Sequence, residues 1–530
     1  MIFYSTESTS RCGYCRNFMP TYKEFARQIQ GWGSVVKVAA INCADSFNTE
    51  VCCANGIQTI PTMKYFPRNT RNYTDGIKLT ADSHSLVRDL KEELLGYVIN
   101  DYNQNKYEDW PKFQYMEENG KANDLWTDID SANFSIIVFE QNDTDATQLM
   151  MDLYPYKNQV DVKRAQDSSP LLKNLEINEY PYVVMYKKGE DKPVFMAPYD
   201  NETTLQEILS RAVPADLVST TQKVITTTEK IEIVNCTTEP EKCKQMFYVS
   251  ETDILKSLYS ALLGDIIRKC DFIQGQNFTD LHNFVNLLAE HFPTKTSTGR
   301  FNRLRARRSE NPTSLERSEK AKQMFGKLKE LLDQKPGNIS VPEWKETFEK
   351  LEYDHGFPFP TNSSWQHCKG STPLFRGYSC GLWTTFHTLT VYTYMDAIKD
   401  PNFNPLQPLQ AIQGWVRSYL WCSPCRKHFM NMTTLDNELP MDERNINTKE
   451  DIFMYLWQAH NRVNKRLHGE GNKFTEDPQF VKNQFPPEFL CPNCHMEGES
   501  NKDQVRDFML DFYSNIKPHQ EDAYVNTNEI

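Results

Sequence analysis

The sequence predicts two kinds of domain in one chain, an α/β half followed by an all-α half. Short apolar runs that contain a proline, at 59–66 and 178–186, predict β-strands within the first 213 residues. From about residue 245, apolar residues recur at helical spacing, for example at Ile254, Leu255 and Leu258. A length of 530 residues is enough for three or four domains with cores of their own.

The first domain, expected at residues 1–100, contains Cys12-Gly13-Tyr14-Cys15 at the start of an amphipathic helix. The apolar runs 35–41 and 59–66 predict a buried strand and a strand that opens with proline. A thiol at a helix N-terminus is favoured as the thiolate by the helix dipole. This CxxC pair therefore predicts a disulfide that exchanges with other thiols.

Residues 101–213 repeat the strand pattern of the first domain without its chemistry. The run 134–139 predicts a strand, and the segment around Pro181 resembles the proline-containing strand of the first domain. No cysteine lies between Cys53 and Cys236, which predicts a redox-inactive second domain. The Ser/Thr-rich stretch 213–229 predicts a linker, and residues 230–355 predict a helix-rich region.

A second CxxC pair, Cys422-Ser-Pro-Cys425, opens another predicted helix within residues 356–515. Pro424 suits the first turn of a helix, and Arg426 and Lys427 add positive charge to the dipole. These surroundings favour a redox disulfide. The alternative is half of a zinc site completed by Cys491-Pro-Asn-Cys494, which follows 66 residues after Cys425. That spacing is far longer than in zinc ribbons, so we expect no metal.

Two polar and aromatic stripes flank this second pair. Trp457, His460, Asn461 and Asn464 share one face of a predicted helix, and Trp383 and His387 lie one turn apart on another. Each stripe alone is more typical of a core with a satisfied histidine. Together, beside an activated CxxC pair, they predict the walls of a flavin site.

These residues resemble the Erv/ALR-type sulfhydryl oxidase domain, from about Pro358 to Tyr513. The whole chain resembles the quiescin sulfhydryl oxidase family, in which that helical domain follows thioredoxin domains. The resemblance implies two thioredoxin-like domains, the first lacking its first strand and helix, and a cis proline at Pro61. It implies FAD as cofactor, held by the following residues: Arg376, Trp383, His387, His428, Trp457, His460, Asn461, Val463, Asn464, Lys482 and Phe485. At Phe485 relatives often have tryptophan.

The resemblance also implies disulfides and an electron relay. Structural disulfides are expected at Cys43–Cys52, Cys368–Cys380 and Cys491–Cys494, and the role of the last pair stays open. The partners of Cys53, Cys236, Cys243 and Cys270 stay open as well. Electrons are expected to pass from a substrate dithiol to Cys12–Cys15, then to Cys422–Cys425, then to FAD and to dioxygen, which gives hydrogen peroxide. In each pair the first cysteine should be the accessible one.

The overall composition limits the partners and the compartment of this chemistry. A net charge of −12 argues against a nucleic-acid-binding protein, and no apolar run is long enough to cross a membrane. Cysteine spacing and N-x-S/T sequons such as Asn72-Tyr-Thr predict a glycoprotein of the secretory pathway (Golgi or ER lumen) or a secreted one. No signal peptide begins the chain, which we therefore expect to be truncated.

We expect a monomer, reduced secretory proteins as substrates, and a disordered tail at residues 516–530. Two other functions stay open: a flavin-free disulfide isomerase or chaperone, and a non-catalytic interaction protein with structural cysteines.

Overall fold

The structure is a computed structural model of the whole chain. It describes the following residues: 1–4, 13–82, 84–116, 126, 132–141, 145–215, 233–296, 314–373, 375–434, 439–468, 476–496 and 499–520. Cys12, residues 216–229 of the linker predicted at 213–229, and the tail beyond residue 520 lie outside the described residues. Two compact units emerge, one comprising Met1–Ile2, Phe18–Ala40 and Met63–Glu229, the other comprising Phe3–Asn17, Ile41–Thr62 and Lys230–Ile530.

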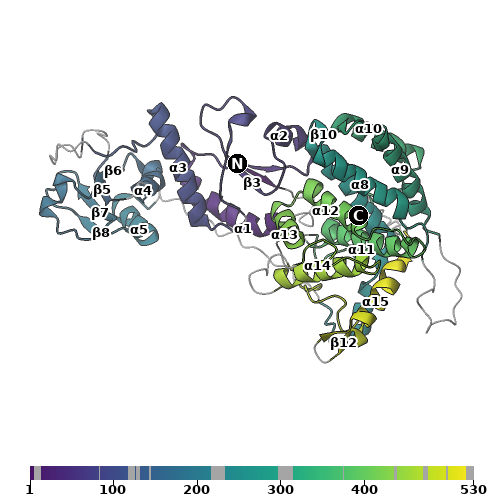
Figure 1. Ribbon diagram of the computed structural model, residues 1–530. Helices are drawn as coiled ribbons and strands as arrows, with labels where there is room; N and C mark the ends of the chain where they lie inside the picture. The colour runs from purple at the N-terminus through teal and green to yellow at the C-terminus, as the bar shows by residue number, and fades with distance from the viewer. Residues whose placement is uncertain are drawn as a thin grey trace, which may run out of the picture. The chain divides into compact units, whose positions relative to one another are not determined.

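The N-terminal region has the predicted α/β composition (Figure 1). Its four strands form one sheet in the order β2-β1-β3-β4. The peptide bond Ile60–Pro61 is cis, as the family resemblance implies. The predicted buried strand at 35–41 is wrong, because only Ala40–Asn42 is extended and its residues are exposed or half-buried. The elements are β1 (Ile2–Tyr4), α1 (Gly13–Gln28), β2 (Ala40–Asn42), α2 (Thr49–Ala54), β3 (Thr62–Tyr65), β4 (Ile77–Lys78) and α3 (Val87–Asn105).

The next region repeats this sheet order, as β6-β5-β7-β8. The central strand β5 runs parallel to β6 and antiparallel to β7, and nearly all of its residues are buried. A second cis proline, Tyr180–Pro181, precedes β7, so the predicted likeness between the two proline-containing strands is confirmed. The elements are β5 (Phe134–Glu140), α4 (Asp145–Leu153), β6 (Val160–Gln166), β7 (Tyr182–Lys187), β8 (Phe195–Pro198) and α5 (Asn201–Ala212).

Helices, together with short two-stranded pairs, form the secondary structure of the residues described from 233 onward. The first group of elements is α6 (Pro240–Met246), β9 (Val249–Ser250), α7 (Glu251–Tyr259), β10 (Phe272–Gln274), α8 (Gln276–His291), α9 (Glu316–Asp333), β11 (Asn338–Ser340) and α10 (Val341–Asp354). The second is α11 (Gly377–Ala397), α12 (Leu406–Tyr419), α13 (Ser423–Thr433), α14 (Asp451–Leu467), β12 (His495–Met496), β13 (Glu499–Ser500), α15 (Lys502–Ser514) and β14 (Ile516–Lys517). The predicted fold class, α/β plus all-α, is confirmed.

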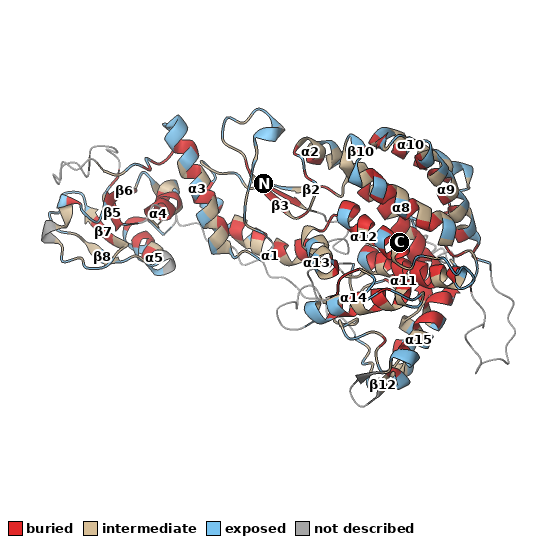
Figure 2. Cartoon of the chain, in the orientation of Figure 1, coloured by how far each residue is buried: buried red, intermediate tan, exposed pale blue. Residues whose placement is uncertain are grey.

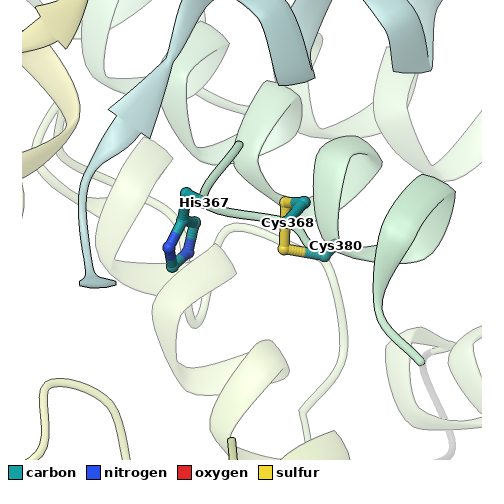
Figure 3. A group of neighbouring side chains, drawn as sticks. All are labelled: His367, Cys368 and Cys380. Carbon is teal, nitrogen blue, oxygen red and sulfur yellow. A yellow bond between two sulfur atoms is a disulfide. The ribbon is translucent and has the colours of Figure 1, made fainter. Parts of the chain in front are cut away.

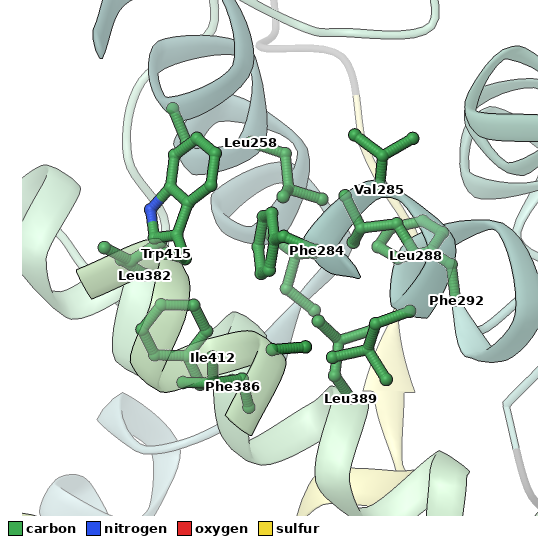
Figure 4. Close-up of a cluster of buried hydrophobic side chains, with 14 of the residues drawn as sticks. Leu258, Phe284, Val285, Leu288, Phe292, Leu382, Phe386, Leu389, Ile412 and Trp415 are labelled. Atoms are coloured by element: carbon green, nitrogen blue, oxygen red, sulfur yellow. The ribbon is translucent and has the colours of Figure 1, made fainter. Parts of the chain in front are cut away.

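Helix α11 lies at the centre of the helical bundle and is buried over most of its length (Figure 2). Gly381 permits the close approach of α7, because a Cβ there would lie 2.8 Å from the Cβ of Ser257. Aromatic rings fill the space between α8, α11 and α12, where Phe284 packs on Trp415 with ring centres 4.5 Å apart (Figure 4). This rigid core fixes the helices that carry the candidate site.

Two predicted boundaries need correction. The boundary between residues 100 and 101 falls inside α3, which continues without a break to Asn105. The tail predicted to be disordered from residue 516 begins with β14, which pairs in parallel with β9. Ile516 is fully buried in the helical core, so burial of its side chain extends the ordered region. Among the described residues, no helix is long and apolar enough to span a membrane.

Disulfides reinforce this fold. Cys43 is bonded to Cys52 and Cys368 to Cys380, in agreement with the pairing that the resemblance implies. The four cysteines whose partners the sequence left open form Cys236–Cys243 and Cys53–Cys270. The last bond closes a separation of 217 residues and ties α2 to the segment before β10.

Candidate functional site

The site begins with Cys422 and Cys425, which form a disulfide at the N-terminus of α13. Cys422 is the N-cap residue and Pro424 lies in the first turn, as the sequence predicts. The partial positive charge of the helix N-terminus stabilises a thiolate formed there by reduction. Arg426 follows at once, and burial lowers the pKa of its guanidinium, although it stays charged.

Cys422 is covered by the loop that holds the cis proline of the N-terminal region. The backbone N–H of Ile60 donates to the carbonyl of Trp421 at 3.2 Å, and the N–H of Ser423 donates to the carbonyl of Ile60 at 3.2 Å. These two bonds enclose Cys422, which is 1% exposed. The expectation that Cys422 is the accessible cysteine is therefore wrong for this arrangement, because the Ile60 loop occupies the surface above it.

The described part of the CGYC motif contacts helices α13 and α14. Cys15 is buried in the first turn of α1, while Cys12 lies outside the described residues. Between them, the hydroxyl of Tyr14 accepts a hydrogen bond from Nη1 of Arg466 at 2.7 Å. The ring of Tyr14 is stacked with that of His428, with centres 6.4 Å apart. The structure thus brings one predicted redox motif next to the other.

A cavity of about 1280 Å³ opens behind Cys425. Cys425 lines it, whereas Cys422 does not, which places the second cysteine on the cavity side of the disulfide. The predicted cofactor-binding residues that line it are Arg376, Trp383, His460, Val463, Asn464, Lys482 and Phe485. Tyr14 and Arg16 of the CGYC segment line it as well. The volume is large enough for a cofactor of several rings.

A stack of aromatic rings forms one wall of the cavity. The rings of Trp383 and His460 are nearly parallel, 4° apart, with centres separated by 4.0 Å. His387 Nε2 lies 2.9 Å from His460 Nδ1, so one of these two nitrogen atoms donates a hydrogen bond to the other. Burial lowers the pKa of His387 to about 3 and that of His460 well below its usual value, which keeps both rings neutral at physiological pH.

His387 has a further property that points to a ligand. Its Nδ1 is buried and has no hydrogen-bond partner in the described part of the chain. Tyr513 stacks on the same imidazole, with ring centres 4.7 Å apart. Since an unpartnered buried nitrogen is costly, this atom is a candidate for contact with a bound molecule. No sequence pattern pointed to Tyr513, which belongs to the otherwise ordinary amphipathic helix α15.

Three residues that were predicted to contact the cofactor form hydrogen bonds to the backbone of the loop 483–485. Of these, Asn464 also lines the cavity, whereas Trp457 and Asn461 do not. Trp457 Nε1 and Asn461 Nδ2 both donate to the carbonyl of Phe485, at 2.5 and 2.9 Å. Asn461 Oδ1 accepts from the backbone N–H of Phe485, and Asn464 Nδ2 donates to the carbonyl of Asn483. Trp457 and Asn461 thus lie one layer behind the cavity wall, where they position the loop.

Two cations provide the electrostatic character of the cavity. Burial lowers the pKa of Lys482 to about 8, with the charge of Arg376 as a second cause. Burial likewise lowers the pKa of Arg376 to about 10. The guanidinium of Arg376 lies 3.7 Å from the centre of the Phe480 ring, and its Nε is buried without a hydrogen-bond partner. Two neighbouring buried cations favour an anionic group between them.

A cluster beside Arg376 has the composition of a metal site but not its chemistry. His367, Cys368 and Cys380 lie together, and the two sulfur atoms are bonded to each other (Figure 3). Disulfide sulfurs are not the thiolates that bind zinc. Arg376 Nη2 also donates to the carbonyl of His367 at 2.9 Å, which places a fixed positive charge there. This cluster is structural.

The third pair, Cys491–Cys494, is also a disulfide. It lies in a short turn, Pro492–Cys494, and Cys494 is fully buried in the helical core. Neither Cys491 nor Cys494 is among the described residues that line the cavity. The structure therefore brings Cys425 to the cavity, with Cys422 on the far side of the same disulfide, and leaves the sulfur atoms of the third pair in a packing position.

Comparisons with known proteins agree with this geometry. Residues 380–486 match the family model described as Erv1 / Alr family, and residues 3–92 match the model described as Thioredoxin. A "Sulfhydryl oxidase 1" of Gallus gallus is 28% identical over 496 residues, which cover 92% of this chain and 60% of the relative. A "Sulfhydryl oxidase 2" of Mus musculus is 28% identical over 536 residues, which cover 97% of this chain and 70% of the relative.

Among solved structures, the "Sulfhydryl Oxidase Fragment of Human QSOX1" is 26% identical, with a TM-score of 0.41. The match covers 51% of this chain and 98% of that one. This chain spans about three fifths of the length of the chicken relative.

Proposed function

Because this chain joins a thioredoxin segment to an Erv1/Alr-family segment, we propose that it is an FAD-dependent thiol oxidase that forms disulfide bonds in proteins. One observation carries the proposal. The Cys422–Cys425 disulfide faces the cis-proline loop at Cys422 and the cavity at Cys425, so each sulfur has a different neighbour. That is the arrangement a disulfide needs to receive electrons on one side and release them on the other.

The residues of the cavity fit FAD. The Trp383 and His460 rings offer a flat apolar surface for a ring system, and Arg376 and Lys482 offer two cations for a diphosphate. Arg376 Nε, which has no hydrogen-bond partner among the described residues, offers a hydrogen-bonding atom at the cavity, and His387 supports the His460 ring without lining the cavity itself. When bound, FAD supplies two-electron redox chemistry, in which an electron pair from a thiolate is passed to dioxygen to give hydrogen peroxide.

The protein's own cysteines carry the preceding steps. A substrate thiolate attacks Cys12, the Cys12–Cys15 bond breaks, and a second substrate thiolate releases Cys12 by forming the substrate disulfide. The Cys12 thiolate then attacks Cys422, and the Cys422–Cys425 bond breaks to leave a Cys425 thiolate at the cavity. Finally Cys15 attacks Cys12 and releases Cys422. Each exchange forms one S–S bond and breaks one, so electrons and atoms balance.

The helix N-terminus of α13 promotes the central step. Its dipole and the neighbouring charge of Arg426 stabilise the Cys425 thiolate as the leaving group. The cis-proline loop excludes water from Cys422 and is held against the Cys422 segment by the Ile60 hydrogen bonds. We place the enzyme in the secretory pathway or outside the cell, because disulfides such as the six among the described residues form and persist in oxidising compartments.

The visible absorption spectrum of the purified protein tests the proposal, together with its oxygen consumption when a reduced, unfolded protein is added. We expect flavin absorbance and one hydrogen peroxide per disulfide formed. His387→Ala should lower flavin content, whereas His282→Ala, a surface histidine beside Asp333, serves as the matched control. A colourless protein that rearranges disulfides without using oxygen would instead be the flavin-free isomerase.

A further inference from the structure

We propose that Arg466 is a specificity-determining residue that selects the chain's own CGYC motif as the electron donor to Cys422–Cys425. It acts as a positioning residue, through the hydroxyl of Tyr14. The proposal rests on the function proposed above and adds the means by which one CxxC segment recognises the other.

The first observation is the hydrogen bond between the two side chains. Arg466 Nη1 donates to the Tyr14 hydroxyl at 2.7 Å, and Tyr14 is only 8% exposed. A guanidinium donor is charged, and charged donors form shorter and stronger hydrogen bonds than neutral ones. Tyr14 stands between the two cysteines of its motif, so a bond to its hydroxyl fixes the motif itself rather than a distant surface.

The second observation is the position of the Tyr14 ring. It is stacked with His428, which follows Cys425 by three residues, one turn along α13. Tyr14 is therefore contacted from two elements, α13 through His428 and α14 through Arg466. A side chain held on two sides has one orientation, which also restricts the orientation of the adjacent Cys15.

Backbone contacts alone do not provide such selection. The two hydrogen bonds between Ile60 and residues 421 and 423 use only peptide groups, which any chain of that shape offers. The Tyr14–Arg466 bond requires a hydroxyl at one place and a guanidinium at the other. A free dithiol protein without tyrosine between its cysteines lacks this bond, so it should compete poorly with the internal donor.

The test measures the limiting rate of flavin reduction in stopped flow, at saturating reduced protein substrate, in the full-length protein. We expect Tyr14→Phe and Arg466→Met each to lower this rate about ten-fold, and the double variant to lower it no further. Arg466→Lys should recover part of the loss because it keeps the charge. Lys465→Met removes the neighbouring exposed cation and should leave the rate unchanged.

A second measurement separates docking from damage to the flavin site. In a Cys12→Ser/Cys15→Ser background, a small dithiol must reduce Cys422–Cys425 directly. Because Arg466 also lines the cavity, flavin absorbance is measured in each variant, and at equal flavin content adding Arg466→Met should leave that rate unchanged. Equal slowing of this direct reaction would overturn the proposal, as would an unchanged limiting rate in both single variants. A parent protein whose flavin is never reduced by protein thiols would contradict the proposed function itself.

Discussion

Two CxxC disulfides in the helical half have the same spacing and different surroundings. Cys422–Cys425 and Cys491–Cys494 each have Cα atoms 5.3 Å apart. The first opens α13, a helix of 11 residues, whereas the second lies in a three-residue turn. The helix supplies a dipole that stabilises a thiolate, and the short turn does not.

Their neighbours differ as well. Cys422 lies against the Ile60 loop and Cys425 lies at the cavity, so the two sulfur atoms of the first pair have different neighbours. Cys494 packs in the apolar core, and its carbonyl accepts from the N–H of Asn501 at 2.9 Å. The comparison teaches that the CxxC spacing fixes the geometry of the disulfide, while its neighbours decide whether it exchanges electrons or stabilises the fold.

The largest effect that we expect from the different surroundings of the two pairs concerns electron transfer from Cys12–Cys15 to Cys422–Cys425. In a Cys15→Ser/Cys425→Ser variant, neither resolving thiol remains, and oxidation of protein dithiols should fall to the background rate. Treatment with a small aromatic disulfide gives Cys12 a leaving group, which the Cys422 thiolate displaces to form a Cys12–Cys422 bond. Non-reducing mass spectrometry should detect the linked peptide, with FAD still bound.

The same experiment can contradict the comparison. If the trapped bond joins Cys12 to Cys491, the third pair carries electrons in spite of its burial. The Cys491→Ser/Cys494→Ser variant, treated in the same way, gives the background for this measurement.

A smaller effect should appear in the pH dependence of FAD binding. The pKa of Lys482 is about 8 in the folded apoprotein, so its positive charge is lost as pH rises through that value. FAD affinity should then fall about ten-fold per pH unit until the pKa of Lys482 in the complex is passed. Fluorescence titration of the apoprotein measures this slope, which Lys482→Gln should remove.

The stability of the apoprotein should change in the opposite direction. The folded-state pKa of Lys482 lies below its usual value of 10.5, so the unfolded chain binds more protons between about pH 8 and 10.5. Stability from this group therefore rises with pH over that range. A fall of both stability and affinity together would show that another group controls the titration.

Particular residues show what the sequence could predict. The CxxC pair at the start of α13, the cis proline at Pro61 and the two helical stripes that contain Trp383 and His460 were predictable, because each depends on local spacing or family resemblance. Helical periodicity identified the face that carries Trp457 and Asn461. It could not tell that they contact the Phe485 backbone, since that depends on a distant loop.

Contacts between residues far apart along the chain could not be predicted from the sequence. Cys53 and Cys270 are separated by 217 residues, and nothing local marks them as partners. Arg466 is one of many surface cations in a chain of mixed charge, and it is distinguished by its hydrogen bond to the Tyr14 hydroxyl and its place at the cavity. Such pairs arise from tertiary packing, which residue spacing along the chain does not encode.

The Cys53–Cys270 bond offers a matched test of stabilisation without electron transfer. A Cys53→Ser/Cys270→Ser variant should lose about 2–4 kcal/mol of unfolding free energy, because this bond restricts a very long loop in the unfolded chain. Denaturant titration followed by circular dichroism measures the loss. A stability equal to that of the parent would mean that these cysteines are not joined in solution.

The smallest effect is expected for the third CxxC pair. Cys491→Ser/Cys494→Ser opens a loop of only three residues, so the entropic loss should be about 2 kcal/mol, less than for the Cys53–Cys270 bond. Oxygen consumption with protein dithiols should stay within about two- to three-fold of the parent, because neither cysteine lines the cavity among the described residues. Flavin absorbance serves as the control for an intact site. If most of the activity is lost while FAD content and folding are unchanged, the short turn at Cys491 carries electrons, and surroundings alone do not decide the role of a CxxC pair.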